Sequence, residues 1–256
     1  MKISLNGYVV DSDDLWLYDW AGYRAFSPET VRQALKDNPS NEPLVLEINS
    51  YGGSVFAADE IYTLLRGADV ETRAEIQSIA ASAASYLCMG CKEVLISPVA
   101  QLMIHPPAIS TSGDKAEHKQ SIKLLDATME SILNAYTAKS NGKRTRDELT
   151  RMMQSTTWLT AEEALDAGLV DGIMFAEEYT PDLKTVVNAA SGSLRAMASC
   201  SPMPMPDQLR AAYHSQDQSH NPEGAPPSKN NTLGWQAKAR LKIEQNRFGG
   251  TKCVEN

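Results

Sequence analysis

Residues 76–107 decide the fold of this chain. They contain Ile76-Gln-Ser-Ile-Ala-Ala-Ser82-Ala-Ala-Ser85 and, further on, Leu102-Met-Ile-His105-Pro-Pro107. A serine follows one apolar strand within a run of very small residues, and a histidine ends a second apolar strand. Small neighbours let another backbone approach the serine, and the start of a helix favours developing negative charge. The pattern predicts Ser82 as a nucleophile and His105 as its base.

A glycine pair upstream completes the pattern. Ile48-Asn-Ser-Tyr-Gly52-Gly53-Ser-Val55 reads as a short strand that the two glycines break. Glycines at a turn expose backbone N–H groups, and such donors stabilise the oxyanion of acyl transfer. Taken singly, a Gly-Gly pair indicates a turn, small residues indicate tight packing, and a lone histidine is usually structural. The three motifs together, in this order, predict a serine-peptidase site.

Strand-like and helix-like segments alternate over residues 1–178. The expected strands are Lys2–Val10, Leu44–Asn49, Glu71–Gln77, Lys92–Ser97, Gln101–His105 and Leu169–Phe175. The expected helices are 28–37, Val55–Arg66, Ala80–Met89, Asp114–Ser140, Arg146–Met153 and one that opens with the capping box Thr160-Ala-Glu-Glu163 and ends before Gly168. This alternation predicts an α/β domain with a largely parallel sheet.

The alternation stops near residue 179. Residues 199–232 are rich in Pro, Ser, Asn, Gln and Met and contain few aliphatic side chains. Such a composition does not supply enough apolar surface for a packed core. We therefore expect one domain over 1–178 and a polar, mostly disordered tail over 179–256, with a short helix at 233–245.

Composition narrows the class of protein. The chain has 256 residues, of which 42% are hydrophobic, and its net charge of −8 arises within residues 1–177. An acidic body argues against nucleic-acid binding. No apolar run has the length of a membrane span, and the first residues lack the apolar region of a signal peptide. These features predict a cytoplasmic protein that binds neither nucleic acid nor membrane.

The cysteines give a weaker signal. Four cysteines at uneven spacing do not indicate a disulfide framework, so the sequence suggests a reducing compartment. Cys88-Met-Gly-Cys91 has the C-x-x-C spacing, but a zinc site requires four ligands and there is no second pair. Structural burial is the preferred interpretation, and metal or redox use is the alternative.

Four blocks of the sequence resemble the ClpP-type serine peptidases. They are Asn49–Val55, Ala80–Ser82, Met103–Pro106 and Trp158–Ala164 with Gly168–Asp171, and the resemblance covers about residues 20–175. The Ala-Ala-Ser-Ala-Ala-Ser and Thr-Trp-Leu-Thr-Ala-Glu-Glu-Ala motifs are typical of the phage head maturation proteases. The resemblance implies a crotonase-like fold of repeated ββα units in homo-oligomeric rings. Helix Asp114–Ser140 would be the handle helix between rings, or alternatively an ordinary core helix.

The resemblance also implies residue roles. Ser82 would be the nucleophile and His105 the general base. The backbone N–H groups of Gly53 and Ala83 would form the oxyanion hole, and Gly52 and Ser54 would contact substrate. No metal or other cofactor is implied.

One position departs from the family pattern. The family's third catalytic residue is an acid two positions before the aromatic of the last block, and here that position is Thr156. A threonine hydroxyl can accept a hydrogen bond, but it cannot offset the charge of an imidazolium. Thr156 is therefore a weaker orienting residue, or another acid such as Asp171 takes the role, or the triad is impaired.

The leading functional hypothesis is an ATP-independent serine endopeptidase that cleaves capsid and scaffold proteins, and its own tail, in the host cytoplasm or inside the phage prohead. A second hypothesis is the proteolytic subunit of a Clp protease that works with an AAA+ unfoldase. A third is an acyl-CoA hydratase or isomerase, although these enzymes use acidic catalytic residues. A fourth is an assembly or scaffold protein with an impaired active site.

Overall fold

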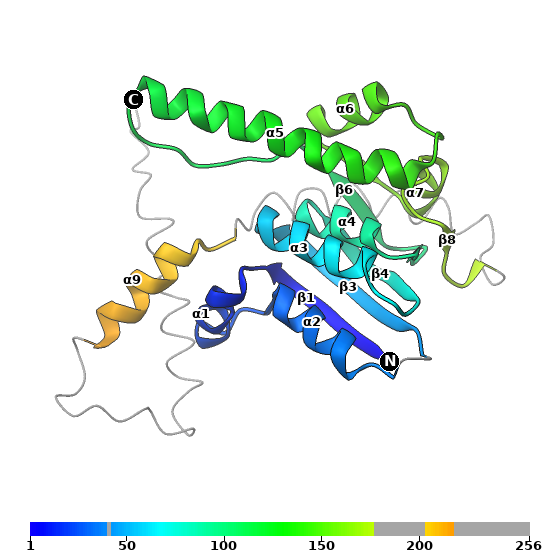
Figure 1. Ribbon diagram of the computed structural model, residues 1–256, viewed down its shortest axis with the longest axis horizontal. Coiled ribbons are helices and arrows are strands. Elements are labelled where there is room, and N and C mark those ends of the chain that lie inside the picture. The colour runs from blue at the N-terminus through cyan, green and yellow to red at the C-terminus, as the bar shows by residue number, and fades with distance from the viewer. Residues whose placement is uncertain (40–41, 177–202, 218–256) are drawn as a thin grey trace, which may run out of the picture.

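The fold is built on an eight-stranded sheet flanked by helices (Figure 1). The computed structural model describes residues 1–39, 42–176 and 203–217. The strands are β1 Lys2–Val9, β2 Ala25–Phe26, β3 Leu44–Gly53, β4 Thr72–Ala81, β5 Glu93–Ile96, β6 Gln101–Ile104, β7 Thr157–Leu159 and β8 Gly172–Ile173. All neighbouring strands pair in parallel except β6 and β7, which are antiparallel. The α/β class with a parallel sheet is thus confirmed.

Two strands, β5 and β6, pair with successive parts of the same side of β4. The main path of the sheet is β2-β1-β3-β4-β5-β8. The first half of β4 pairs with β5, from Arg73 to Ile76, and its last three residues pair with β6 instead. The sheet therefore divides along β4, and β6 accompanies this strand to its carboxyl end, where ligands of parallel sheets usually bind.

Helices cover the sheet and extend beyond it. They are α1 Leu15–Trp20, α2 Pro28–Asp37, α3 Val55–Arg66, α4 Ala83–Leu87, α5 Lys115–Ser140, α6 Arg146–Gln154, α7 Ala161–Asp166 and α9 Pro206–Asp217, with 3-10 turns η1 Ser12–Asp14 and η2 Cys88–Gly90. Ser27, Asp114, Thr145 and Thr160 begin α2, α5, α6 and α7 with capping boxes, which satisfy the first N–H groups of each helix.

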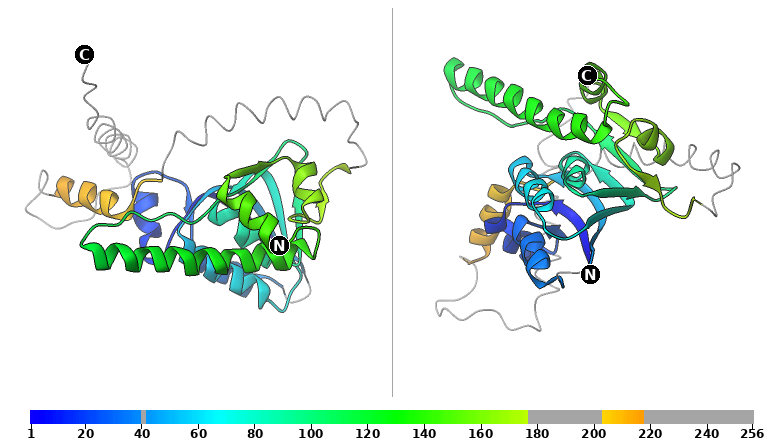
Figure 2. Two further views of the ribbon diagram at one scale, coloured as in Figure 1. Left: turned by 90° about the horizontal axis from the view of Figure 1, so that it is seen from above. Right: turned by 45° about the vertical axis from the view of Figure 1, so that its right-hand side comes forward.

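Helix α5 packs on the body through its second half only. Ile132, Leu133, Ala135 and Tyr136 are buried in the main core, whereas Ile122 in the first half is 57% exposed. Figures 1 and 2 show the first half extending beyond the sheet. The helix thus joins the core at one end and presents a free surface at the other.

Several element bounds differ from the expected ones. β3 continues through Gly52-Gly53, and β4 runs to Ala81, so the helix after it begins at Ala83 and not at Ala80. The expected last strand shrinks to the two residues of β8. Parallel pairing with neighbouring strands lengthens β3 and β4, which local apolar patterning does not reveal.

The C-terminal part of the chain contains a helix that composition does not predict. Helix α9 lies within 199–232, where the sequence suggests a linker without regular structure. It lies beside α1 in both Figure 1 and Figure 2. The expected helix at 233–245 and most of 179–256 lie outside the described residues. None of the described helices has the length and apolarity needed to cross a membrane.

The core of the sheet gives a stability prediction. Leu46 lies on the central strand β3 and is fully buried, so Leu46→Ala should lower the free energy of unfolding by about 2–5 kcal/mol. Leu124→Ala, at a side chain that is 43% exposed, serves as the control and should cost much less. Urea unfolding followed by circular dichroism measures both, and equal losses would contradict this core.

Candidate active site

Ser82 occupies a strained turn between β4 and α4. Its backbone has φ +56° and ψ −127°, a conformation that a residue with a side chain rarely adopts. The Ser82 N–H donates to the carbonyl oxygen of Met103 on β6 over 3.0 Å. Ala81 and Ala83 on either side are buried, so the chain turns within a very small space. A strained serine between a strand and a helix is the geometry of an exposed nucleophile.

The hydroxyl groups of Ser85 and Tyr136 stabilise this turn through hydrogen bonds. The carbonyl oxygen of Ser82 accepts hydrogen bonds from the Ser85 N–H over 2.9 Å and from the Ser85 hydroxyl over 2.6 Å. Ser85 Oγ also lies 2.6 Å from the hydroxyl of Tyr136 on α5. Since Ser85 has one hydroxyl proton, Tyr136 must be the donor, and burial raises its pKa and keeps it protonated. Sequence reasoning missed this brace because its two side chains are 51 residues apart.

His105 lies next to Ser82 because β6 pairs with the end of β4. Ala81 is level with Met103, so the residues just beyond these strands meet at one edge of the sheet. His105 Nε2 is 2.6 Å from Ser82 Oγ. Pro106 and Pro107 follow and prevent the strand from continuing. The expected nucleophile and base are thus in hydrogen-bonding contact.

The environment of His105 favours its neutral form. Burial lowers the pKa of the imidazole from its ordinary value of 6.5, because desolvation penalises the charged ring. A neutral ring with Nε2 facing a hydroxyl can accept the hydroxyl proton. The geometry therefore suits general-base activation of Ser82 near neutral pH.

Gly52 and Gly53 bring β3 into contact with Ser82. A methyl group at Gly52 would lie 2.7 Å from the Ala81 carbonyl oxygen and 2.8 Å from Ser82 Cβ, so only glycine fits there. Gly52 and Gly53 have φ values of +97° and +154°, which glycine adopts without strain. The N–H of Ser54 donates to the carbonyl oxygen of Val9 on β1 over 2.8 Å. The glycine turn of β3 therefore lies directly against Ser82.

Ala83 and Ser54, the other residues expected to contact the oxyanion or the substrate, differ in whether their polar groups are free to do so. Ala83 is the first residue of α4, so its N–H has no carbonyl partner within the helix. The hydroxyl of Ser54 caps α3 by accepting from the Ala57 N–H and also donates to Asp11 Oδ1 over 2.9 Å. Ser54 lines the groove beside Ser82, but its hydroxyl already has two partners.

Thr156 and Asp171, the two residues considered for the third role, lie in different places. The antiparallel pairing of β6 and β7 ends with Ile104 opposite Thr157, so His105 and Thr156 are the next residues at the same end of this strand pair. Asp171 accepts from the Val94 N–H over 2.7 Å and pairs with Lys139. Val94 is level with Ala74, eight residues before Ser82 along β4, or about 26 Å at 3.3 Å per residue. Asp171 therefore cannot serve as the third residue, and in the described part of the chain no carboxylate hydrogen-bonds to His105.

A groove of about 680 Å³ runs past the Ser82–His105 pair. Its walls come from the β3–α3 turn, the segment after His105 and helix α5. Tyr51, Phe56, Ile109 and Leu124 line it and are exposed. Their apolar surfaces suit the side chains of a peptide.

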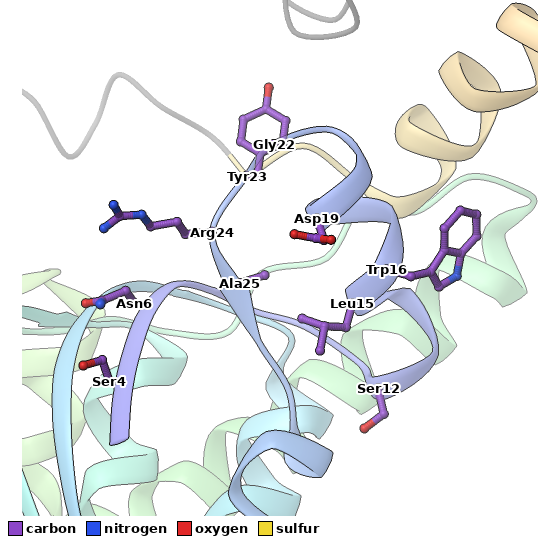
Figure 3. Close-up of a pocket in the computed structure, with 10 residues that line it drawn as sticks. All are labelled: Ser4, Asn6, Ser12, Leu15, Trp16, Asp19, Gly22, Tyr23, Arg24 and Ala25. Atoms are coloured by element: carbon purple, nitrogen blue, oxygen red, sulfur yellow. The ribbon is translucent and has the colours of Figure 1, made fainter. Parts of the chain in front are cut away.

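A second hollow lies away from this pair. Its volume is about 760 Å³, and β1, α1 and β2 line it, with Trp16, Asp19 and Arg24 among its side chains (Figure 3). Neither Ser82 nor His105 borders it. The groove of about 680 Å³, which contains Ser82 and His105, is therefore the candidate active site.

The C-x-x-C cysteines are buried thiols. Burial raises the pKa of Cys91 to about 12 and that of Cys88 well above its ordinary value. Thiolates are the forms that bind metals and react, so these surroundings favour a structural role. Within residues 1–39, 42–176 and 203–217, no three potential metal ligands gather into a site.

Sequence comparisons relate this chain to known proteases. A family model described as "Clp protease" matches residues 29–177. ATP-dependent Clp protease proteolytic subunit 1 of Chlamydia pneumoniae is 30% identical over 146 residues, which cover 56% of this chain and 74% of that protein. The subunit 1 of Chlamydia abortus is 29% identical over 143 residues, covering 54% and 73%. The proteolytic subunit of Ligilactobacillus salivarius is 29% identical over 137 residues, covering 53% and 68%.

The surroundings of His105 give a titration prediction. In NMR spectra of the ring protons, assigned by comparison with His105→Gln, His105 should titrate with a pKa below 6.5 because of its burial. Protonation then occurs more readily in the unfolded chain, so the stability from this group is present above pH 6.5 and falls as pH decreases below it. A midpoint above 6.5 would reveal a carboxylate beside the ring and contradict the described site.

Proposed function

The chain belongs to the Clp protease family, and from that premise we propose that Ser82 and His105 are the catalytic pair of this serine peptidase. The observation that carries the proposal is the 2.6 Å contact between His105 Nε2 and Ser82 Oγ at the end of two paired strands. Glycine at position 52 and alanines on both sides of Ser82 leave room for a substrate backbone. The substrate class is polypeptide.

The proposed mechanism has two stages. His105 Nε2 accepts the Ser82 proton as Oγ attacks the scissile carbonyl carbon, and the carbonyl oxygen becomes an oxyanion. The N–H groups of Gly53 and Ala83 stabilise this charge. His105 then gives its proton to the leaving amine, and an acyl-enzyme remains. A water molecule, deprotonated by His105, hydrolyses this ester and restores Ser82.

The third position limits the rate in this proposal. Thr156 stands where the family's acid is expected, and a threonine can orient the imidazole but cannot stabilise its positive charge. Replacing the acid of a serine protease by a neutral residue reduces turnover by about 10⁴. We therefore expect a slow peptidase whose reactivity depends on the strained turn at Ser82.

Two biological settings fit such a peptidase. The relatives named ATP-dependent Clp protease proteolytic subunit favour the first, in which this chain forms rings and degrades proteins delivered by an AAA+ unfoldase. The projecting half of α5 offers an apolar surface for ring contacts. The second setting is phage head maturation, with capsid and scaffold proteins as substrates. Residues beyond 177, outside the family match, and the missing acid favour this second setting.

Active-site labelling tests the catalytic pair. A fluorophosphonate probe should label the wild-type chain at Ser82, Ser82→Ala should abolish labelling, and His105→Ala should slow it by about 10² or more. Ser110→Ala, at an exposed serine in the same region, is the matched control and should label normally. Equal labelling of Ser82→Ala and wild type would contradict the proposal and favour an assembly protein with an inactive site.

Restoring the acid tests the role of position 156. Thr156→Asp should raise kcat/KM for a peptide substrate by about tenfold or more and should raise the pKa of His105. Thr156 has φ +52°, a conformation that aspartate tolerates better than a β-branched residue. Ser155→Asp, one position away and also exposed, is the control. If kcat/KM rises only in Ser155→Asp, or in neither variant, a carboxylate at position 156 does not interact with the His105 imidazole.

The two settings can be separated by one pair of measurements. Stimulation of casein degradation by an AAA+ unfoldase with ATP supports the Clp setting. Ser82-dependent self-cleavage beyond residue 177, seen by intact-mass spectrometry without ATP, supports head maturation.

A further inference from the structure

The C-terminal segment 203–217 is anchored on the first helix of the chain. Leu209 of α9 is fully buried in a small apolar cluster that is separate from the main core. Its partners there are Val10, Leu17, Tyr18 and Ala21. Figure 1 and Figure 2 both show α9 alongside α1. The cluster therefore joins the segment around α1 to residues 203–212, which are far apart in the sequence.

Polar and aromatic contacts fix the register of this docking. The Tyr18 hydroxyl donates to the Pro204 carbonyl oxygen over 2.7 Å in a buried position. Arg210 pairs with Asp14, whose side chain is only 10% exposed. The ring of Tyr213 meets the rings of Trp16 and Trp20 edge-on, both with centroids 5.3 Å apart. Because these contacts are specific in partner and geometry, they fix the position of the segment on α1 more closely than apolar packing alone would.

The anchored segment extends to the groove that contains Ser82 and His105. Met203, Met205 and Pro206 line this groove. The same groove is lined by Tyr8, Val10 and Asp11 at the end of β1, by α5 and by the segment after His105. The groove stays open at about 680 Å³ with the segment in place, and Met205 is 54% exposed. The segment is therefore a wall of the groove and does not plug it.

We propose that Met203-Pro-Met-Pro206 is a substrate-contacting wall that selects apolar side chains for cleavage at Ser82, with Met205 as its specificity-determining residue. The proposal rests on the proposed peptidase function and adds to it the class of preferred substrate. The family match ends at residue 177, so this wall lies outside the part of the chain shared with the Clp proteases.

The chemistry of the wall supports an apolar preference. Methionine is unbranched and flexible, so it adapts to apolar side chains of different shape. Pro204 and Pro206 have no N–H group, which prevents two of the four residues from donating to a substrate backbone. Recognition by this wall therefore depends on side-chain contact, whereas main-chain pairing is left to the other walls. Tyr51, Phe56 and Ile109 on those walls are also exposed and apolar.

Exchanging the wall's chemistry is the main test. In the full chain, Met205→Glu should shift the ratio of kcat/KM between lysine-containing and leucine-containing peptides of otherwise equal sequence by about tenfold toward lysine, through KM. Ala211→Glu adds the same charge on an exposed face of α9 and should leave the ratio unchanged. An unchanged ratio in Met205→Glu, or an equal shift in both variants, would overturn the proposal.

Releasing the anchor is the second test. Leu209→Asp should detach the segment, raise KM for a leucine-containing peptide several-fold and leave kcat nearly constant, with Ala211→Asp as control. Hydrogen exchange at α1 and α9 reports release independently of activity. If exchange shows release and KM is unchanged or lower, the wall does not contact substrate. If peptide cleavage persists in Ser82→Ala, the peptidase proposal fails instead, so the two failures are distinguishable.

Discussion

The pairing of β6 with the end of β4 is the constraint on which the site depends. Because β4 leaves β5 and continues beside β6, Ser82 and His105 arrive at the same edge although 23 residues separate them. The bond from the Ser82 N–H to the Met103 carbonyl oxygen fixes the turn between them. The glycines of β3 complete the site. Gly52 lies against Ser82, where a residue with a side chain would clash.

Local signals were enough to predict most elements and to single out Ser82 and His105, which the fold brings into contact. Helix-start residues located the helix at 28–37, and apolar periodicity located those at 55–66 and 115–140. The small residues around Ser82 indicated the passage from a strand to a helix. The true ends of β3 and β4 depend on neighbouring strands, so local patterns placed them too early. The Ser85–Tyr136 brace and the docking of Leu209 join distant parts of the chain, and no local pattern encodes them.

The site combines strong positioning with weak charge stabilisation. A strained serine, a close histidine and a backbone braced by Ser85 all place the reacting atoms well. The imidazole, in contrast, is half-buried and accepts no carboxylate partner among the described residues, so forming imidazolium is costly. Serine proteases that lack a triad member still accelerate hydrolysis by about 10³–10⁴-fold over water, through their oxyanion hole and substrate binding. Under the proposed mechanism, this combination gives well-placed reacting atoms and a slow peptidase.

Three consecutive residues at the end of β1 serve two parts of the molecule. The Val9 carbonyl oxygen bonds the Ser54 N–H and closely approaches Gly53, Val10 belongs to the cluster that holds Leu209, and Asp11 bonds the Ser54 hydroxyl. Mutations near Gly53 and mutations in α9 therefore act through a common tripeptide, and their effects will be epistatic.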